Sequence, residues 1–197
     1  LSADIVTYEG VEMIQLCKTP PEEYNSRGMQ LWVLNNPPLA EEGIINITYK
    51  GGYTHTSHGK MAGAVALSGV NNTIPLQDYL CARPEIFPDD KEFSLDSNNG
   101  GFVFANIFAG WTQQVVSYEG QIRLWEQRMS QAIEKAVADY KIASDEETTI
   151  GFEFSGGGGG TAHIAASINP AQAENPDPPA SVNSYKFEKI KVVGSSG

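Results

Sequence analysis

Hydrophobic and polar residues alternate loosely in several short segments near the start of the chain, a pattern that is typical of β-strands. Proline and glycine pairs such as Pro20-Pro21 and Gly51-Gly52 separate these segments. Such residues end strands because they fix φ, adopt left-handed conformations or lack an N–H donor. We therefore predict β structure with frequent turns in this region. The extended segments cover residues 4–16, 29–34, 43–49 and 61–70.

Between residues 121 and 143 the hydrophobic spacing changes to three and four residues, which is the period of an α-helix. No glycine or proline interrupts this stretch, and Gly120 precedes it. We therefore predict a long amphipathic helix over about 121–143, with its apolar face packed on a sheet. The residues of that face are Ile122, Trp125, Met129, Ala132, Ile133, Ala136, Val137 and Tyr140.

Two segments between these regions have a less regular pattern. Residues 75–101 contain Pro84, Pro88 and an asparagine- and glycine-rich end, so we predict a long irregular loop or a boundary there. Residues 102–118 are rich in aromatic residues and fit strands, or a short helix over 106–114.

The last third of the chain again shows strand-like patterns. We predict strands over 148–154, 162–168 and 185–193, the five glycines at 156–160 as a hairpin tip, and 169–179 as a linker. The fold class that follows is mainly β, of jelly-roll or β-sandwich type, with one long amphipathic helix. An α+β fold is the alternative.

Composition and charge limit the possible partners. The 197 residues include 41% hydrophobic and 10% aromatic residues, which is typical of a globular chain. Twenty-four acidic against 13 basic residues give a net charge of −11, so the surface repels phosphate backbones and nucleic acid is not an expected partner of this stretch. Apolar runs such as 61–70 are shorter than the roughly 18 residues that span a bilayer, so we predict no transmembrane segment.

Three features bear on the cellular compartment without deciding it. The chain begins with Leu1 rather than Met, which we interpret as a processing boundary or the start of a piece of a longer protein. Cys17 and Cys81 could form one disulfide in an oxidising compartment, but a reduced protein can equally contain two cysteines. The sequons at Asn46 and Asn71 would accept a glycan only if the chain enters a secretory pathway.

Candidate chemistry is sparse. His55 and His58 are weak metal-ligand candidates, because they would point to opposite faces of a strand and the remaining histidine is His163. Ser57 and Ser155 could serve a hydrolase, but each lacks the first glycine of the nucleophile-elbow pattern. We therefore predict no catalytic residue, no metal and no cofactor, and we interpret the chain as a non-enzyme.

The region from residue 5 to residue 49 resembles the closing strands of the jelly-roll shell domain in coat proteins of small icosahedral RNA viruses, of the tombusvirus-like and nodavirus-like kind. In these proteins a proline-rich loop, a turn ending in glycine and two short strands close the domain. The matching residues are Thr19-Pro20-Pro21, Tyr24-Asn25-Ser26-Arg27-Gly28, Leu31-Trp32-Val33 and Gly43-Ile44-Ile45-Asn46-Ile47-Thr48-Tyr49.

The resemblance implies a structural capsid protein of the virion, present as a fragment or cleavage product, because the strands that normally precede this region are missing. It divides the chain into a β segment over 1–60 and a β-rich domain with the helix over 61–197. Copies of the chain or other capsid chains would be its partners, and strands left unpaired would associate through apolar interface residues. These residues are Leu31, Val33, Ile45 and Ile47.

Two other function classes fit the residues. One is a processed, extracellular binding protein or toxin of α+β type that acts on a cell-surface receptor. The other is a hydrolase with an unrecognised site.

Overall fold

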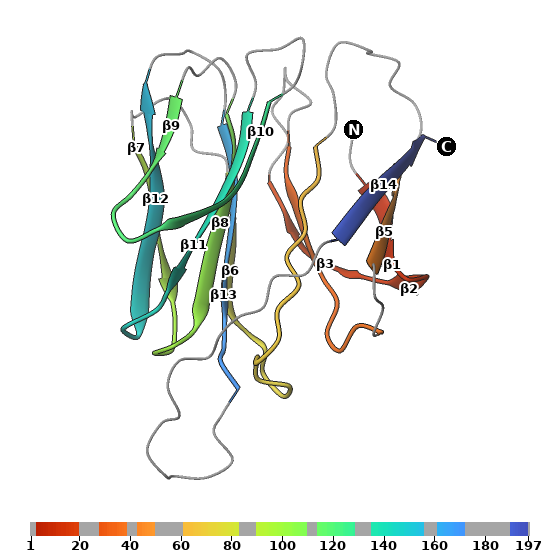
Figure 1. Cartoon of the computed structure of the whole chain (residues 1–197), viewed down its shortest axis with the longest axis horizontal. Helices are drawn as coiled ribbons and strands as arrows, with labels where there is room; N and C mark the ends of the chain where they lie inside the picture. The colour runs from red at the N-terminus through yellow and green to blue at the C-terminus, as the bar shows by residue number, and fades with distance from the viewer. Residues whose placement is uncertain are drawn as a thin grey trace.

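The computed structural model describes residues 3–19, 28–38, 43–49, 61–82, 90–109, 114–128, 135–155, 161–171 and 190–196. Every element of regular secondary structure in these residues is a β-strand. Figure 1 shows them stacked in three layers, with β7, β12 and β9 on one side, β10, β11, β8, β13 and β6 in the middle, and the amino-terminal strands with β14 on the other side. The described residues include no helix of the length and hydrophobicity that a membrane crossing requires.

The first two layers form a sandwich. The large sheet has the order β10-β11-β8-β13-β6, and the small sheet has the order β7-β12-β9. The eight strands of the sandwich are β6 (Leu76–Ala82), β7 (Asp90–Asp96), β8 (Phe102–Ala109), β9 (Gln114–Ser117), β10 (Ile122–Arg128), β11 (Lys135–Ile142), β12 (Glu147–Ser155) and β13 (Thr161–Ile168).

The pairing of these eight strands is nested. β6 pairs with β13, β7 with β12, and β8 with β11, all antiparallel, so the chain folds as one long hairpin wrapped around a common core. These three nested pairs are those of a jelly roll. The one departure is β10, which pairs with β11 in the large sheet and not with β9 in the small sheet.

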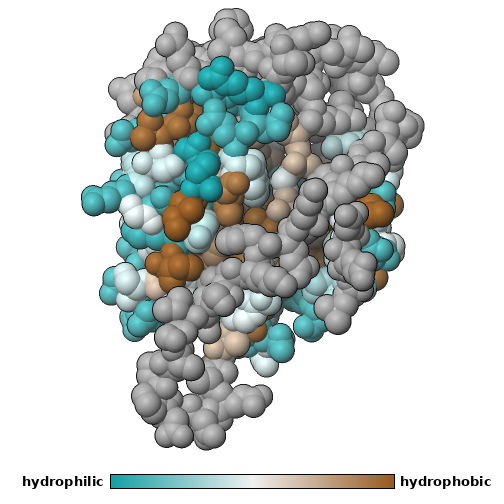
Figure 2. All heavy atoms as spheres, viewed as in Figure 1, coloured by the Kyte–Doolittle hydropathy of each residue, from teal (hydrophilic) through white to brown (hydrophobic). Residues whose placement is uncertain are grey.

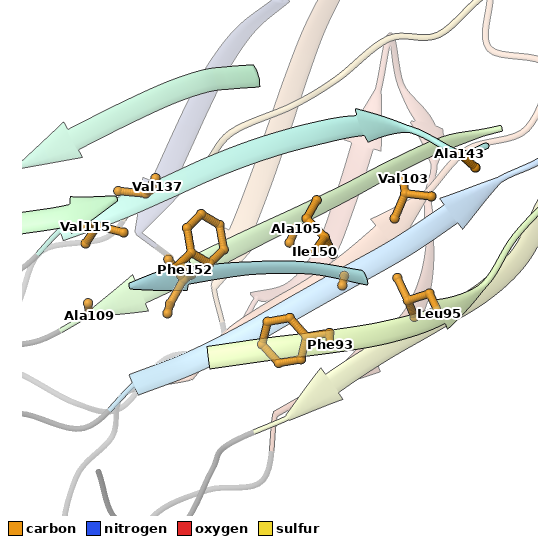
Figure 3. Close-up of a cluster of buried hydrophobic side chains, with 12 residues drawn as sticks. Phe93, Leu95, Val103, Ala105, Ala109, Val115, Val137, Ala143, Ile150 and Phe152 are labelled. Carbon is orange, nitrogen blue, oxygen red and sulfur yellow. The ribbon is translucent and has the colours of Figure 1, made fainter. Parts of the chain in front are cut away.

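The core of the jelly roll lies between its two sheets. Alternate residues of β8 and β12 point inward, and Figure 3 shows Val103 and Ala105 from one strand near Ile150 and Phe152 from the other. All four side chains are fully buried. Because strand residues alternate between faces, the intervening residues of β8 face the amino-terminal layer.

The amino-terminal layer contains a four-stranded sheet in the order β14-β5-β1-β2 and a β3-β4 hairpin. Glu9 and Gly10 connect β1 to β2 with positive φ at both positions, as a two-residue type I′ hairpin requires. β5 pairs with β1 on one side and, in parallel, with β14 on the other. The strands are β1 (Ala3–Tyr8), β2 (Val11–Glu12), β3 (Ile14–Lys18), β4 (Gln30–Val33), β5 (Gly43–Tyr49) and β14 (Ile190–Ser196).

Two small cores hold this layer in place. Val6, Ile45 and Ile47 are buried within the four-stranded sheet's inner face, and burial also raises the pKa of the Tyr49 phenol beside them. The β3-β4 hairpin places Leu31 against Ile164 and neighbouring residues of the large sheet. The second core therefore joins the amino-terminal layer to the jelly roll.

The predicted helix over 121–143 is wrong. Its described residues form β10 and β11, which pair with each other in an antiparallel ladder. β11 is also paired with β8 and is buried on both faces from Lys135 to Asp139, so its sequence lacks the alternation of apolar and polar residues that marks a strand with one exposed face. In β10, a register shift between Arg123 and Trp125 breaks the alternation. Together these two features mimic the spacing of a helix.

Other expectations are corrected in the same way. Strands β6 and β7 lie within the stretch that was expected to be irregular, and the short helix over 106–114 is absent from its described part, since β8 continues to Ala109 and β9 begins at Gln114. Residues 61–68 form no strand, although they are extended and apolar. β14 covers Ile190–Ser196 and so continues past the end of the strand expected over 185–193. The strands expected over 43–49, 148–154 and 162–168 are confirmed.

At Gly63, the segment 61–68 lies directly against the side chain of Trp125 in β10. A Cβ atom at this position would lie 2.4 Å from Cζ2 of Trp125 in β10. We therefore expect Gly63→Ala to lower the free energy of unfolding by about 1 to 2 kcal/mol, because overpacking exceeds the entropy gained by replacing glycine. Urea titration measures this loss. Ala62→Ser at the exposed neighbour is the control, and equal stability of the two variants would contradict the contact.

Candidate functional site

The histidines do not form a site in the described residues. His163 is fully buried on β13, on the inward side of the jelly roll, with its ring centroid 4.9 Å from that of Phe93. His55 and His58 lie outside the described residues. The residues that the structure describes contain no group of three or more His, Cys, Asp or Glu side chains suited to hold a metal ion.

The residues considered for a hydrolase are not brought together within the described chain. Ser57 lies outside the described residues, and the side chain of Ser155 is not described either. Glu153 is exposed on the outer face of the small sheet, opposite Val116 in the neighbouring strand β9. His163, on β13 of the large sheet, is buried in the core and is thus separated from Glu153 by the small sheet.

The four residues expected at an interface have different surroundings. Ile45, Ile47 and Leu31 are buried in the cores of this chain, and β5 has a partner strand on each side. Val33 is partly exposed and lies opposite Ile14 of β3. Only Val33 therefore belongs to a surface that a second molecule could contact.

An apolar patch lies at one end of the large sheet, on the face that points away from the jelly-roll core. Ile122 of β10 is 55% exposed and lies opposite Tyr140 of β11, and Ile142 is 40% exposed two residues farther along β11. The Tyr140 ring is stacked on that of Phe102, with centroids 5.0 Å apart. We call Ile122, Tyr140 and Ile142 the β10–β11 patch. Figure 2 shows brown apolar side chains among teal polar ones over the part of the molecule where Figure 1 places β9 and β10.

Charged residues form a cluster on the opposite face of the same two strands. The Asp139 carboxylate is fully buried, and it accepts hydrogen bonds from Arg123 Nε and, at 3.1 Å, from Gln121 Nε2. Arg123 Nη2 also donates to Ser117 Oγ at 2.9 Å and to the Val115 carbonyl at 3.3 Å, both in β9. Arg123 therefore bridges the two sheets where β9 and β10 are not paired.

The cluster extends along the sheet edge. Arg123 Nη1 donates to Glu126 Oε2 at 3.0 Å, and the other oxygen of Glu126 lies 3.2 Å from Nζ of the nearly buried Lys135. The side-chain amide of Gln121 pairs with the backbone of Gly151 in β12: Oε1 accepts from the Gly151 N–H at 2.7 Å, and Nε2 donates to the Gly151 carbonyl at 2.9 Å. These bonds satisfy buried charges and backbone groups at the open side of the sandwich. The cluster is thus a structural clamp beneath the β10–β11 patch.

A disulfide joins Cys17 of β3 to Cys81 of β6, which are 64 residues apart in sequence. The sequence left open whether these cysteines are bonded. The bond links the amino-terminal hairpin to the edge strand of the large sheet, next to the core that contains Leu31. It therefore fixes one layer to another rather than closing a local loop.

Sequence reasoning missed both the clamp and the patch. Arg123 and Asp139 lie 16 residues apart, and the predicted helix would have separated them by more than four turns. The hairpin places them directly opposite each other.

Comparisons with known proteins identify no relative of this chain. No protein-family model matches it, and no curated protein or solved structure matches it significantly.

Proposed function

We propose that this chain is an extracellular, disulfide-stabilised β-sandwich module that binds a protein partner. The observation that carries the proposal is the Cys17–Cys81 bond between two layers of the fold. Structural disulfides of this kind persist in oxidising compartments and are rare where thiols are kept reduced. This proposal corresponds to the extracellular binding protein that was expected as an alternative, with a β-sandwich in place of the α+β fold.

The β10–β11 patch is the proposed contact surface. Its residues are two exposed isoleucines and the aromatic ring of Tyr140. Apolar centres that contain aromatic residues are typical of protein interfaces. Isoleucine offers no hydrogen bonds to sugar hydroxyls, so we assign a protein rather than a glycan as the partner. The clamp beneath the patch keeps its two strands in fixed register.

The experiment is to apply the labelled protein to an array of extracellular receptor domains and, separately, to a glycan array. We expect saturable binding to the protein array and a loss of at least tenfold in affinity for Ile142→Lys, because a buried unpaired charge costs more than about 1.4 kcal/mol. Ile74→Lys is the matched control, since Ile74 is 59% exposed on a turn outside the patch. Binding to the glycan array alone, or equal losses for both variants, would contradict the proposal.

A second candidate function is a self-assembling coat or shell protein, as the resemblance implies. The observation that favours it is a set of exposed apolar residues in the amino-terminal layer. Ile14 of β3 lies opposite Val33 of β4. Ile14 is 62% exposed, and Ile5 of β1 is 42% exposed. Copies of the chain could cover Ile14 and Val33, so Val33 would keep its expected role.

Light scattering coupled to size-exclusion chromatography separates the two candidates. Self-assembly predicts a defined oligomer at micromolar concentration that Ile14→Lys dissociates and Ile74→Lys does not. The binding module predicts a monomer in all three proteins. A monomeric wild type would therefore reject the shell function through this surface.

A further inference from the structure

The sequon Asn46-Ile47-Thr48 lies in the middle of β5, where the structure gives it a specific geometry. Ile45 and Ile47 point into the core, whereas Asn46 and Thr48 are exposed on the outer face of the amino-terminal sheet. Alternation along a strand places the amide and the hydroxyl on the same face. Within the described residues, the Asn46 side chain makes no hydrogen bond that would hold its amide nitrogen against the sheet.

The surface around Asn46 contains exposed apolar side chains. Ile44, two residues earlier on the same face, is 39% exposed. Ile5 of β1 lies opposite Thr48, which makes it a diagonal neighbour of Asn46, and it is 42% exposed. A flat sheet face that exposes such residues favours association unless something covers it. A bulky, soluble group attached at Asn46 would cover both isoleucines.

We propose that Asn46 carries an N-linked oligosaccharide, an inference that rests on the proposed extracellular function. In the reaction, Nδ2 of Asn46 forms a bond to the anomeric carbon of a sugar supplied as a lipid pyrophosphate-linked oligosaccharide. The bond between that carbon and the pyrophosphate oxygen breaks, the amide loses one proton, and the lipid pyrophosphate leaves. The cellular glycosyltransferase supplies the catalysis, and this chain supplies the acceptor.

The second sequon, Asn71-Asn72-Thr73, provides an internal comparison. Oδ1 of Asn71 accepts hydrogen bonds from the backbone N–H groups of Thr73 and Ile74, both at 2.9 Å. The Asn71 backbone N–H donates to the Asn169 carbonyl at 3.0 Å, so this residue helps to hold two segments together. The Asn71 side chain is therefore hydrogen-bonded within a turn. By contrast, Asn46 pairs with neighbouring strands through its backbone, and its side chain is exposed to solvent.

The test is to produce the chain through the secretory pathway of a eukaryotic cell and to measure glycan occupancy at each sequon by peptide mass spectrometry. We expect most secreted molecules to carry a glycan at Asn46, removable by an enzyme that converts the glycosylated asparagine to aspartate. Thr48→Ala should abolish the modification, whereas Thr48→Ser should retain it, because the transferase requires a hydroxyl at this position. Thr48 is exposed, so neither variant is expected to affect folding.

Secreted protein with Asn46 unmodified would overturn this inference, whether or not Asn71 is occupied. The same samples test the proposed function separately through the state of Cys17 and Cys81, measured by thiol labelling before and after reduction. Free thiols in the secreted protein would contradict the extracellular function. A bonded pair with an unmodified Asn46 would reject the glycan alone.

Discussion

Replacing Arg123 by glutamine should lower the free energy of unfolding by about 3 to 5 kcal/mol, because it leaves a buried carboxylate without its charged partner. Asp139 is fully buried, and its remaining described hydrogen-bond donor is the neutral amide of Gln121. Arg123 also makes the side-chain bonds between β10 and β9, where no backbone ladder joins these strands. Urea or guanidinium titration followed by circular dichroism measures the loss.

A double-mutant cycle assigns the loss to the buried pair. Asp139→Asn removes the charge that needs compensation, so the double variant Arg123→Gln/Asp139→Asn should be less destabilised than the sum of the two single changes. Arg128→Gln is the control, because Arg128 is 65% exposed and lies 3.9 Å from Glu126, so its loss should cost under about 1 kcal/mol. Additive losses in the cycle would show that Arg123 and Asp139 do not interact.

Replacing both cysteines by serine should destabilise the protein by about 4 kcal/mol. The bond closes a loop of 64 residues, and the chain-entropy relation for a loop of that length gives a value of this order. Because the bond joins the β3-β4 hairpin to β6, we also expect amides of β3 and β4 to exchange hydrogen faster than those of β8 and β13 in the variant. Chemical denaturation and hydrogen-exchange mass spectrometry provide the two measurements.

The reduced wild-type protein is the control for this prediction. Wild type in excess reductant should unfold at the same denaturant concentration as the double variant Cys17→Ser/Cys81→Ser. Identical midpoints for the oxidised wild type and the double variant would show that the disulfide does not stabilise the fold. Uniform acceleration of exchange in all strands would instead contradict its role as a local link between layers.

Strands with one buried face could be predicted from the sequence alone. Ile45 and Ile47 alternate with polar or exposed residues, and the predicted strand over 43–49 is found unchanged as β5. β7 contains the same alternation in Phe93 and Leu95, which point inward between polar residues, but nearby prolines and charges favoured an irregular segment. In both cases the information lies in the alternation, because a strand exposes successive side chains to different environments.

The sequence did not distinguish a strand buried on both faces from a helix. Val137 and Asp139 point into the jelly roll, while Ala136 and Ala138 face the amino-terminal layer, and all four are buried. Without a polar face, β11 has no two-residue period, so its composition of alanine, valine and charged residues favoured a helix. The long-range ladder with β8 overrides that local preference.

The sequence by itself determined that the chain is rich in β-strands, carries a net charge of −11 and contains one possible cysteine pair. These properties follow from local alternation and composition. Only the tertiary structure decided that Cys17 meets Cys81, that Arg123 meets Asp139, and that Ile122 and Ile142 share one surface. The physical reason is that strand pairing joins residues distant in sequence, and its register depends on the packing of both sheet faces rather than on any local pattern.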